Sequence, residues 1–301
     1  MMVPSVSIGL PVYNGERYLE KSIQSLLAQT RDDFEILISD NHSSDRTREI
    51  CESYARADRR IRYTRNPENL GAAENYNRVF REAAGRYFKW ASHDDLCAPE
   101  FLARCVAVLE TDPSVVLCYP RTTFIDEEGN SIGLYEETDE FTDPHPSVRL
   151  RTWLFERSGA WCNAVFGVIR SDVLRRTPLI GKYNSSDVIL LGELLLRGRM
   201  VRIPDVLFYR RDHEGRSVRA HADEEARAVW FDPAAAGKAH MPAWRWLRGY
   251  SSAIRRVPMN AGDKCRCGVL LSRWAMTQRG RLKDELLKSS RKNVAVRTRT
   301  V

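Results

Sequence analysis

The sequence lacks an uninterrupted apolar run of the roughly 18 residues that a membrane-spanning helix requires. Its start, MMVPSVSIGLPVYNG, also lacks a basic segment followed by a long apolar stretch, so we expect no secretory signal peptide. The 7 cysteines are odd in number and scattered, which is a poor basis for a disulfide framework. These absences favour a protein of the reducing cytoplasm.

Two glycine-rich phosphate-binding fingerprints are missing as well. Neither G-x-x-x-x-G-K nor G-x-G-x-x-G occurs in the chain. Their absence argues against a kinase, an ATPase or a dinucleotide-dependent oxidoreductase. A nucleotide bound by this chain would have to rely on a metal ion for its phosphates.

Charge is distributed unevenly along the chain. The whole chain carries a net charge of +7, yet residues 245–301 alone contain 15 Lys and Arg against 3 Asp and Glu, so the remainder is net negative. A basic tail of this kind could face nucleic acid, anionic lipid or water. The acidic remainder and the absence of any recognisable nucleic-acid module argue against a nucleic-acid partner.

Strand-like and helix-like segments alternate through the first 120 or so residues. Short apolar runs indicate strands at 3–10 (stopping at Pro11), 34–39, 61–65, 87–91 and 115–119. Helical spacing of apolar residues indicates helices at 16–29, 46–57, 70–84 and 99–109. The alternation predicts an α/β fold with a doubly wound, mostly parallel sheet and helices on both faces.

Beyond this region the pattern is looser. It indicates a hairpin turn at 126–130, strands at 166–170 and 206–210, and a Leu-rich helix at 186–197. From about residue 222 the chain becomes helical, Trp-rich and basic. We therefore predict an α/β domain over 1–221 and a helical basic extension over 222–301, with disorder from about residue 290.

Ligands of doubly wound sheets bind outside the carboxyl ends of the strands. That rule brings together the segments 11–15, 40–45 and 92–95. Asp94 and Asp95 follow an apolar strand, and two adjacent carboxylates there are costly unless a cation shares them. Mg²⁺ and Mn²⁺ take such carboxylates together with substrate phosphates. The alternative is that one of the two aspartates caps the helix beginning near residue 99.

The other two segments carry groups suited to a nucleotide base. Asp40, at a strand end, could accept a hydrogen bond from a base edge such as the N3–H of uracil or thymine. Tyr13 could stack on the same base. The alternative for Tyr13 is an ordinary half-buried tyrosine, whereas Asp45 is expected to cap the helix that starts at 46.

Several short motifs, in order and at suitable spacing, resemble a family 2 glycosyltransferase. They are Val6-Ser-Ile-Gly-Leu-Pro-Val-Tyr-Asn14, Ile38-Ser-Asp-Asn41, Ser44-Asp-Arg-Thr47, Asn69-Leu-Gly71, and His93-Asp-Asp95 with Pro99. The resemblance covers residues 3 to about 120 closely and extends more loosely to about 217. It implies a GT-A fold, a nucleotide-sugar donor, a divalent metal (Mg²⁺ or Mn²⁺) and inversion of anomeric configuration.

The resemblance also assigns residues to the donor and the metal. Pro11, Tyr13 and Asn14 would line the donor base, and Asp40 would bond it. Asp94 and Asp95 stand at the end of the family's D-x-D metal motif, whose first aspartate is replaced here. Either carboxylate of the pair could therefore be the ligand.

In the second half the resemblance implies that Asp187 is the catalytic base, although that residue could instead cap the following helix. His213 is a candidate third metal ligand or an ordinary surface histidine. Arg210 or Arg211 is a candidate phosphate clamp. Trp161 and Asn163 stand where acceptor contacts tend to come.

The partners and rival functions follow from the same features. The donor is expected to be a UDP- or dTDP-sugar, and the acceptor a glycan, a lipid-linked glycan or a small molecule such as a natural product. Trp244, Trp246 and Trp274 lie in basic helices that could contact the inner face of a membrane peripherally, or could pack on the core. Rival functions are a sugar-phosphate nucleotidyltransferase, a non-catalytic nucleotide-sugar- or nucleic-acid-binding protein, and an inactive transferase that binds donor without turnover.

Overall fold

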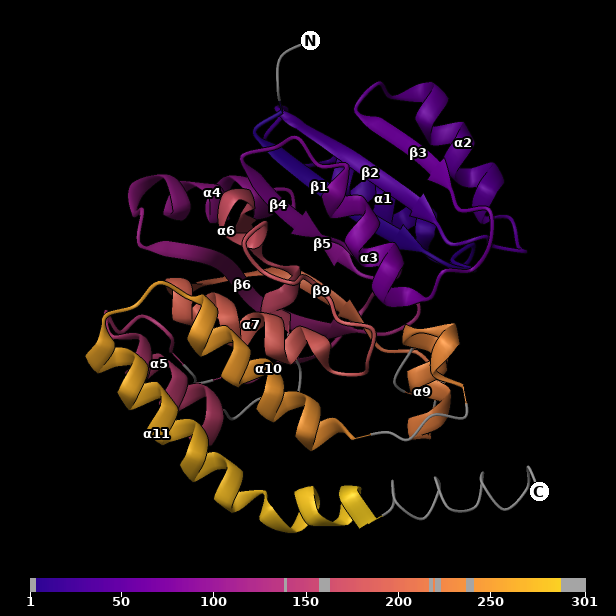
Figure 1. The fold of residues 1–301 in the computed structure, drawn as a ribbon. Helices are drawn as coiled ribbons and strands as arrows, with labels where there is room; N and C mark the ends of the chain where they lie inside the picture. The colour runs from indigo at the N-terminus through magenta and orange to yellow at the C-terminus, as the bar shows by residue number, and fades with distance from the viewer. Residues whose placement is uncertain are drawn as a thin grey trace, which may run out of the picture.

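The computed structural model describes residues 4–137, 140–156, 163–216, 219, 223–236 and 241–287. Within these residues nine strands form one sheet in the order β3-β2-β1-β4-β8-β6-β9-β5, with β7 paired to β6 (Figure 1). The strands are β1 (Val6–Val12), β2 (Phe34–Asp40), β3 (Ile61–Arg65), β4 (Tyr87–Trp90), β5 (Leu96–Cys97), β6 (Val115–Ile125), β7 (Ser131–Leu134), β8 (Val168–Arg170) and β9 (Arg199–Arg211).

Helices connect and cover these strands. They are α1 (Leu19–Leu27), α2 (Thr47–Ala57), α3 (Ala72–Arg81), α4 (Phe101–Thr111), α5 (Pro146–Arg151), α6 (Ser171–Leu174), α7 (Ser186–Arg197), α9 (Glu224–Phe231), α10 (Pro242–Arg256) and α11 (Ala261–Thr277). Shorter turns are η1 (Thr152–Glu156), η2 (Asn163–Phe166) and η3 (Pro233–Ala235). The predicted α/β class is confirmed.

The first half of the sheet is parallel. β1 pairs in parallel with β2 and β4, and β2 with β3, so their carboxyl ends meet at one edge. Every residue of β1 is buried, as expected for a strand covered on both faces. The strand continues through Pro11 to Val12, beyond its predicted end. Pro11 pairs with Ser39 of β2 and lies past the last paired residue of β4, so its missing N–H costs no bond to β4.

The second half of the sheet is mixed. β8 is antiparallel to both β4 and β6, β9 is parallel to β6, and β5 is antiparallel to β9. β6 and β9 are much longer than the apolar runs that predicted them. The residues that the prediction missed include buried Thr122, Thr123 and Arg211. Polar side chains such as these interrupt the apolar pattern from which strands are predicted.

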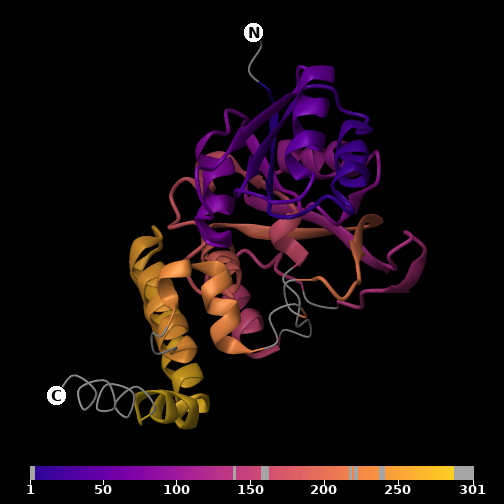
Figure 2. The ribbon, with the colours of Figure 1, turned by 90° about the vertical axis from the view of Figure 1, so that its right-hand side faces the viewer.

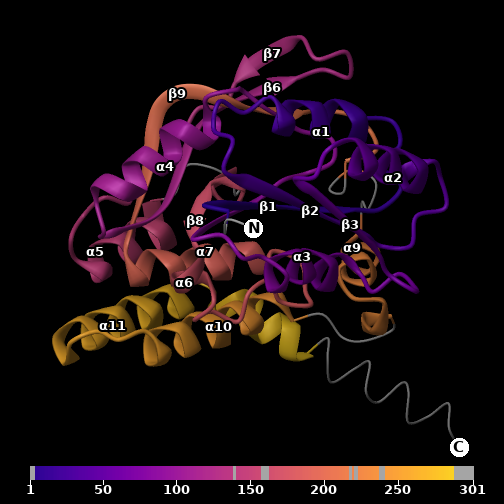
Figure 3. The same ribbon diagram turned by 90° about the horizontal axis from the view of Figure 1, so that it is seen from above.

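Helices lie on both faces of the sheet (Figure 3). α1, α2 and α4 cover one face, and α3, α6 and α7 cover the other. α10 and α11 pack outside α5 and α7, and Figure 2 shows them in orange and yellow beyond the α/β body.

The Trp-rich helices α10 and α11 belong to the core on the face of the sheet that α3, α6 and α7 cover. Trp274 is only 6% exposed and stacks on Trp246 at a centroid distance of 6.4 Å. The indole Nε1 of Trp244 donates to the carbonyl of Leu282 at 2.9 Å. Packing on the core, one of the two sequence-based alternatives, is therefore confirmed for these helices. None of the described helices is both long enough and apolar enough to cross a bilayer. The expected disorder from about residue 290 lies outside the described residues.

Candidate active site

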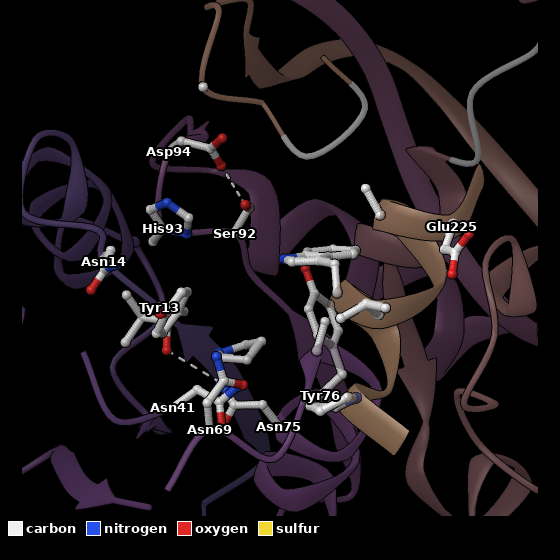
Figure 4. Close-up of a pocket in the computed structure, with 18 of the residues that line it drawn as sticks. Tyr13, Asn14, Asn41, Asn69, Asn75, Tyr76, Ser92, His93, Asp94 and Glu225 are labelled. Atoms are coloured by element: carbon white, nitrogen blue, oxygen red, sulfur yellow. Dashed lines mark hydrogen bonds between the residues drawn. The ribbon is translucent and has the colours of Figure 1, made fainter. Parts of the chain in front are cut away.

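A pocket of about 1050 Å³ opens at the carboxyl ends of β1, β2 and β4 (Figure 4). Its walls come from the ends of these strands, from the start of α3, and from α9 and η3 on the opposite side. It is lined by Pro11, Val12, Tyr13, Asn14, Asn41, Asn69, Ala72, Asn75, Tyr76, Ser92, His93, Asp94, Gly215, Asp223, Glu225, Ala226, Val229, Trp230 and Pro233. The strand ends that the sequence placed side by side therefore do meet.

The segment after β1 forms the rim of the pocket. Asn14 adopts a left-handed conformation with φ of 49°, which asparagine tolerates better than most residues. Its side chain accepts a hydrogen bond from the backbone N–H of Ser44, and its own N–H donates to the Ser43 hydroxyl. This turn leaves Tyr13 42% exposed in the pocket wall. Pro11, Tyr13 and Asn14 thus all line the pocket, as a role in donor binding requires.

Asp40 lies beneath the pocket and does not line it. The side chain is fully buried, and its carboxylate accepts hydrogen bonds from the Ser43 N–H at 2.8 Å and the Tyr63 hydroxyl at 3.0 Å. The next residue, Asn41, lines the pocket instead. A direct bond from Asp40 to a base stays a prediction, and in this structure the carboxylate fixes the loop that carries Ser43.

Four asparagines that sequence reasoning did not single out as site residues form a network at the pocket, and three of them, Asn41, Asn69 and Asn75, line it. Asn41 accepts from Asn66 and donates to Asn69, while Asn75 donates to the carbonyls of Val12 and Ser39. These bonds tie the ends of β1 and β2 to the start of α3. Asn41 and Asn69 each belong to one of the short motifs found in the sequence, whereas Asn66 and Asn75 had no such signal.

Asp94 and His213 come together at the pocket. The carboxylate of Asp94 lies 2.9 Å from Nε2 of His213, and the Ser92 hydroxyl donates to the same carboxylate. Burial opposes ionisation of Asp94, but neighbouring His93 and the hydrogen bonds from His213 and Ser92 outweigh it and hold the pKa below its ordinary value. Asp94 is therefore an ionised, oriented carboxylate.

Asp95 has a different environment from its neighbour. Burial, with the charge of Asp94 adding to it, raises the pKa of Asp95 to about 7. Its Oδ1 accepts the backbone N–H of Arg211 at 2.9 Å, and it does not line the pocket. Neither aspartate caps α4, because β5 intervenes and the residue before the helix is Glu100. The capping alternative is thus not what the structure shows.

The two candidate arginines differ in environment. Arg211 is fully buried, and its guanidinium donates to the backbone carbonyls of Asp94, Asp126 and Glu127. Arg210 donates to the side chain of Asn163. Arg211 therefore holds the Asp94 backbone in place, whereas the role of Arg210 as a phosphate clamp stays a prediction; neither arginine lines the pocket.

Tyr76 marks the point where the two halves of the site converge. Burial raises the pKa of Tyr76 above its ordinary value, and the carboxylates of Asp94, Asp95 and Asp187 raise it further. Arg210 acts on it in the opposite direction. Because such electrostatic effects weaken with distance, the Tyr76 side chain, which lines the pocket, lies within reach of all four charges.

Asp187 lies in the first turn of α7, with Ser185 at the N-cap position. No side-chain hydrogen bond caps this helix, so Asp187 is not acting as its cap. Asn163, a candidate acceptor contact, is buried beside Arg210. The other candidate, Trp161, lies outside the described residues.

The metal-ligating groups at Asp94 fit a divalent cation of the Mg²⁺ or Mn²⁺ type. Such ions take one or two protein carboxylates and complete their shell with water and substrate phosphates. Asp94 supplies an ionised carboxylate, and His213 supplies an imidazole beside it. In the described part of the chain no group of three or more His, Cys, Asp and Glu side chains is arranged to hold a metal alone. A bound cation would therefore depend on ligands from the substrate.

The wall opposite Asp94 comes from α9, which sequence reasoning assigned to the C-terminal extension. Ala226, Val229 and Trp230 of this helix line the pocket. α9 approaches the start of α3 so closely that a Cβ on Gly71 would lie 2.6 Å from the carbonyl oxygen of Phe231. Residues from both sides of the predicted boundary at 221/222, such as Gly215 and Asp223, thus line the pocket. The two-part division of the chain stays a prediction.

Comparison with known proteins identifies a protein family and several relatives. The model of the family described as Glycosyl transferase family 2 matches residues 7–180, more than half of the chain. An uncharacterized glycosyltransferase of Methanocaldococcus jannaschii is 34% identical over 129 residues, covering 42% of this chain and 44% of the relative. Chondroitin synthase of Escherichia coli is 32% identical over 130 residues, covering 43% of this chain and 19% of the synthase. The chain thus spans less than half the length of either relative.

Solved structures share the fold over nearly the whole chain. Residues 1–349 of S. aureus TarS in complex with UDP-GlcNAc superpose with a TM-score of 0.57 at 17% identity, covering 98% of this chain and 92% of that one. The mannosyltransferase PcManGT of Pyrobaculum calidifontis, in complex with GDP-Man and Mn²⁺, superposes with a TM-score of 0.54 at 18% identity. That alignment covers 96% of this chain and 87% of the mannosyltransferase.

Proposed function

The chain belongs to glycosyl transferase family 2, and from that membership we propose that it moves a sugar from a nucleotide-sugar donor to an acceptor hydroxyl, with inversion at the anomeric carbon. One observation carries the proposal. The pocket at the carboxyl ends of the parallel strands contains Asp94, whose carboxylate lies 2.9 Å from Nε2 of His213, and Tyr76 in its wall lies within electrostatic reach of Asp187 and Arg210.

The donor occupies this pocket with its base toward Tyr13 and its diphosphate toward Asp94. Tyr13 offers an exposed ring for stacking. Asp94, kept ionised by its neighbours, would hold a divalent cation together with His213. When bound, that cation supplies the positive charge that a departing diphosphate needs. Arg210 adds a second positive charge beside the same group.

Asp187 serves as the general base. It accepts the proton of the acceptor hydroxyl while the hydroxyl oxygen forms a bond to the anomeric carbon. The bond between that carbon and the diphosphate oxygen breaks, and the nucleoside diphosphate leaves on the opposite face with the electron pair. General-base help of this kind is typically worth about 10²–10⁴ in rate.

The donor class is a UDP- or dTDP-sugar, and the acceptor is a glycan, a lipid-linked glycan or a small molecule. UDP-GlcNAc in TarS and GDP-Man with Mn²⁺ in PcManGT are the ligands of two proteins of the same fold. Because these neighbours differ in base, a donor screen must include guanine as well as uracil and thymine. The product would belong to a polysaccharide, a lipid-linked glycan or a glycosylated natural product.

A peripheral contact with the inner face of a membrane would suit a lipid-linked acceptor. The outer side of α11 carries Val269 and Met276, which are 55% and 67% exposed, beside the exposed basic side chains of Arg266 and Arg273. Apolar and basic side chains together favour an anionic lipid surface. Cosedimentation with anionic but not zwitterionic vesicles, weakened in Met276→Glu, is the expected result.

The first experiment is a thermal-shift and donor-hydrolysis screen of UDP-, dTDP- and GDP-sugars, with Mg²⁺, with Mn²⁺ and with chelator. We expect one nucleotide to raise the melting temperature in a metal-dependent manner, and Asp94→Asn to abolish that effect. Asp172→Asn is the matched control, because Asp172 lies on α6 with its side chain 65% exposed. A folded protein that responds to no donor with either metal would overturn the proposal.

A further inference from the structure

A second cavity, of about 240 Å³, lies on the far side of α9 from the donor pocket. Its walls come from the loop before α7, from α9, from the start of α10 and from the helical segment 279–287. It is lined by Tyr183, Asn184, Ser185, Ala228, Pro242, Arg245, Trp246 and Arg281. α9 therefore serves both cavities, with Ala228 facing this one and Val229 facing the donor pocket.

The two arginines of this cavity lack anionic partners among the described residues, and Arg281 donates only to the side-chain oxygen of Gln278, at 3.4 Å. Across the part of the chain that the structure describes, neither Arg245 nor Arg281 forms an ion pair. The guanidinium of Arg245 instead lies 5.4 Å from the centroid of the Tyr183 ring. The indole Nε1 of Trp246 is buried and has no hydrogen-bond partner. Two positive charges and an unpaired N–H in one cavity favour an anion.

The start of α7 adds further unpaired donors. No side chain caps this 12-residue helix, and the Ser186 hydroxyl in its first turn is buried without a partner. The free N–H groups and the dipole of a helix N-terminus favour negative charge. The start of α10 is different, because Glu285 already accepts the N–H groups of Ala243 and Trp244 at 3.0 and 3.3 Å.

Two carboxylates lie near the cavity and reduce its positive charge. Glu285 is held by the start of α10, and Asp187 acts electrostatically on Tyr183. Neither lines the cavity wall, whereas both arginines do. The wall itself is therefore positive.

Resting on the proposed function, we propose that this cavity binds a phosphate group carried by the acceptor. Ser185 lines the cavity and lies two residues before Asp187, so an acceptor anchored here by its phosphate brings a neighbouring hydroxyl toward the base. Phosphate suits the site because arginines bind its oxygens with paired, charge-assisted hydrogen bonds. The acceptor is thus a phosphate-bearing sugar, a phosphate-containing glycan or a glycan on a lipid phosphate.

The test uses glucose 6-phosphate and glucose as a matched pair of probes, titrated calorimetrically into the full chain with UDP and metal present to fill the donor pocket. We expect glucose 6-phosphate to bind and glucose not to bind. Arg245→Gln and Arg281→Gln should each weaken binding on the order of tenfold or more, because a charged hydrogen bond is lost. Arg245→Lys should bind more tightly than Arg245→Gln but less tightly than the parent, because lysine keeps the charge and loses the paired donors. Thermal unfolding of each variant confirms that it is folded.

Arg248→Gln is the control. It lies on α10 one turn beyond Arg245, is exposed, and does not line the cavity. It should leave binding unchanged. If glucose binds as well as glucose 6-phosphate, or if the Arg245 and Arg281 variants bind as the parent does, the proposal is overturned.

A second arm identifies the source of the phosphate. Zwitterionic vesicles that carry a polyprenyl phosphate are compared with the soluble sugar phosphate, each competed with inorganic phosphate. Stronger vesicle binding that depends on Arg245 indicates a lipid carrier, and its absence indicates a soluble or polymeric acceptor. UDP binding and donor hydrolysis are measured in the same samples. If donors bind and are hydrolysed but no phosphate binds, the acceptor inference fails alone, whereas absence of all donor binding counts against the proposed function.

Discussion

Asp187 is the residue on which the proposed chemistry depends most directly. Replacing it with asparagine removes the proton acceptor and leaves the shape of the first turn of α7 nearly unchanged. We expect Asp187→Asn to lower turnover by about 10²–10⁴, while donor affinity and melting temperature stay close to those of the parent. Steady-state rates of nucleoside diphosphate release, alongside calorimetric donor binding, measure the two effects separately.

Asp172→Asn again serves as the control for that substitution, because it removes a carboxylate from an exposed position on α6. Equal turnover in Asp187→Asn and the parent would contradict the role of Asp187. If such a protein still bound donor and neither form showed turnover, an inactive transferase would be the better description.

Individual site residues could be predicted from the sequence where they follow strand ends, because parallel strands bring those ends to one edge of the sheet. Sequence reasoning placed Asp94 and His213 in one site, and the structure brings them within 2.9 Å. It did not find Tyr76, whose role depends on which distant charged groups the fold brings near it, and no local pattern shows that. Nor could it show that Asp40 is bonded internally, since Tyr63 belongs to another strand.

Among the secondary-structure elements, α9 packs closely against a single glycine at the start of α3, Gly71. Gly71 has φ of 82°, and a Cβ there would lie 2.6 Å from the carbonyl oxygen of Phe231 at the end of α9. We expect Gly71→Ala to weaken nucleotide binding by displacing α9, in addition to a backbone cost of about 1 kcal/mol. Nucleotide titration and chemical denaturation measure the two consequences.

Gly129→Ala separates these effects. Gly129 also has a positive φ, of 104°, but a Cβ there meets nothing within 4 Å. It should therefore show the backbone cost without any loss of nucleotide affinity. Equal affinity in the two variants would mean that α9 does not depend on its approach to Gly71.

The contact between α7 and α10 leads to a second prediction about helix packing. A Cβ on Gly192 of α7 would lie 2.4 Å from the ring of Tyr250, which is only 2% exposed. We expect Gly192→Ala to destabilise the protein by about 1–3 kcal/mol because the ring cannot move freely within the core. Urea denaturation measures the loss.

The matched control is Gly268→Ala in α11, where a Cβ meets nothing within 4 Å. There alanine should stabilise the helix by up to about 1 kcal/mol, because glycine is the poorer helix former. The opposite signs of the two substitutions separate close packing from helix propensity. A stabilising Gly192→Ala would show that α10 adjusts to the extra methyl group.

Element prediction succeeded where apolar periodicity was strong and failed where polar residues joined a long strand. α7 was predicted with the bounds it has, Ser186–Arg197, because its leucines are dense and Gly198 ends it. β6 and β9 were predicted only in part, because polar residues interrupt the apolar pattern: the second half of β6 contains buried Thr122, and the missed residues of β9, 199–205 and Arg211, include four charged side chains. The pocket-lining role of α9 had no local signal, because it depends on packing against distant α3.

Across the whole molecule, the C-terminal helices complete the core of one face of the sheet. Tyr250, Ile254 and Trp274 belong to the same cluster as Leu191 and Leu194 of α7. We therefore expect a chain that ends at residue 240 to be insoluble or to lose cooperative unfolding, since it exposes this face. Differential scanning calorimetry of the truncated and full chains tests this.

A chain that ends at residue 287 is the control, because it keeps every described residue of that cluster. It should unfold at the temperature of the full chain. A soluble, cooperatively folded chain ending at 240 would instead show that the first 240 residues fold independently, as the predicted division at 221/222 implies.

The position of α9 between two cavities has a consequence for the order of events in a catalytic cycle. One helix cannot settle against a donor on one side without altering the wall that it presents on the other. The occupancies of the two cavities are then coupled, and thermodynamic linkage makes that coupling reciprocal. The expected kinetic pattern is sequential rather than ping-pong. Donor binding would improve acceptor affinity, and acceptor binding would improve donor affinity by the same factor.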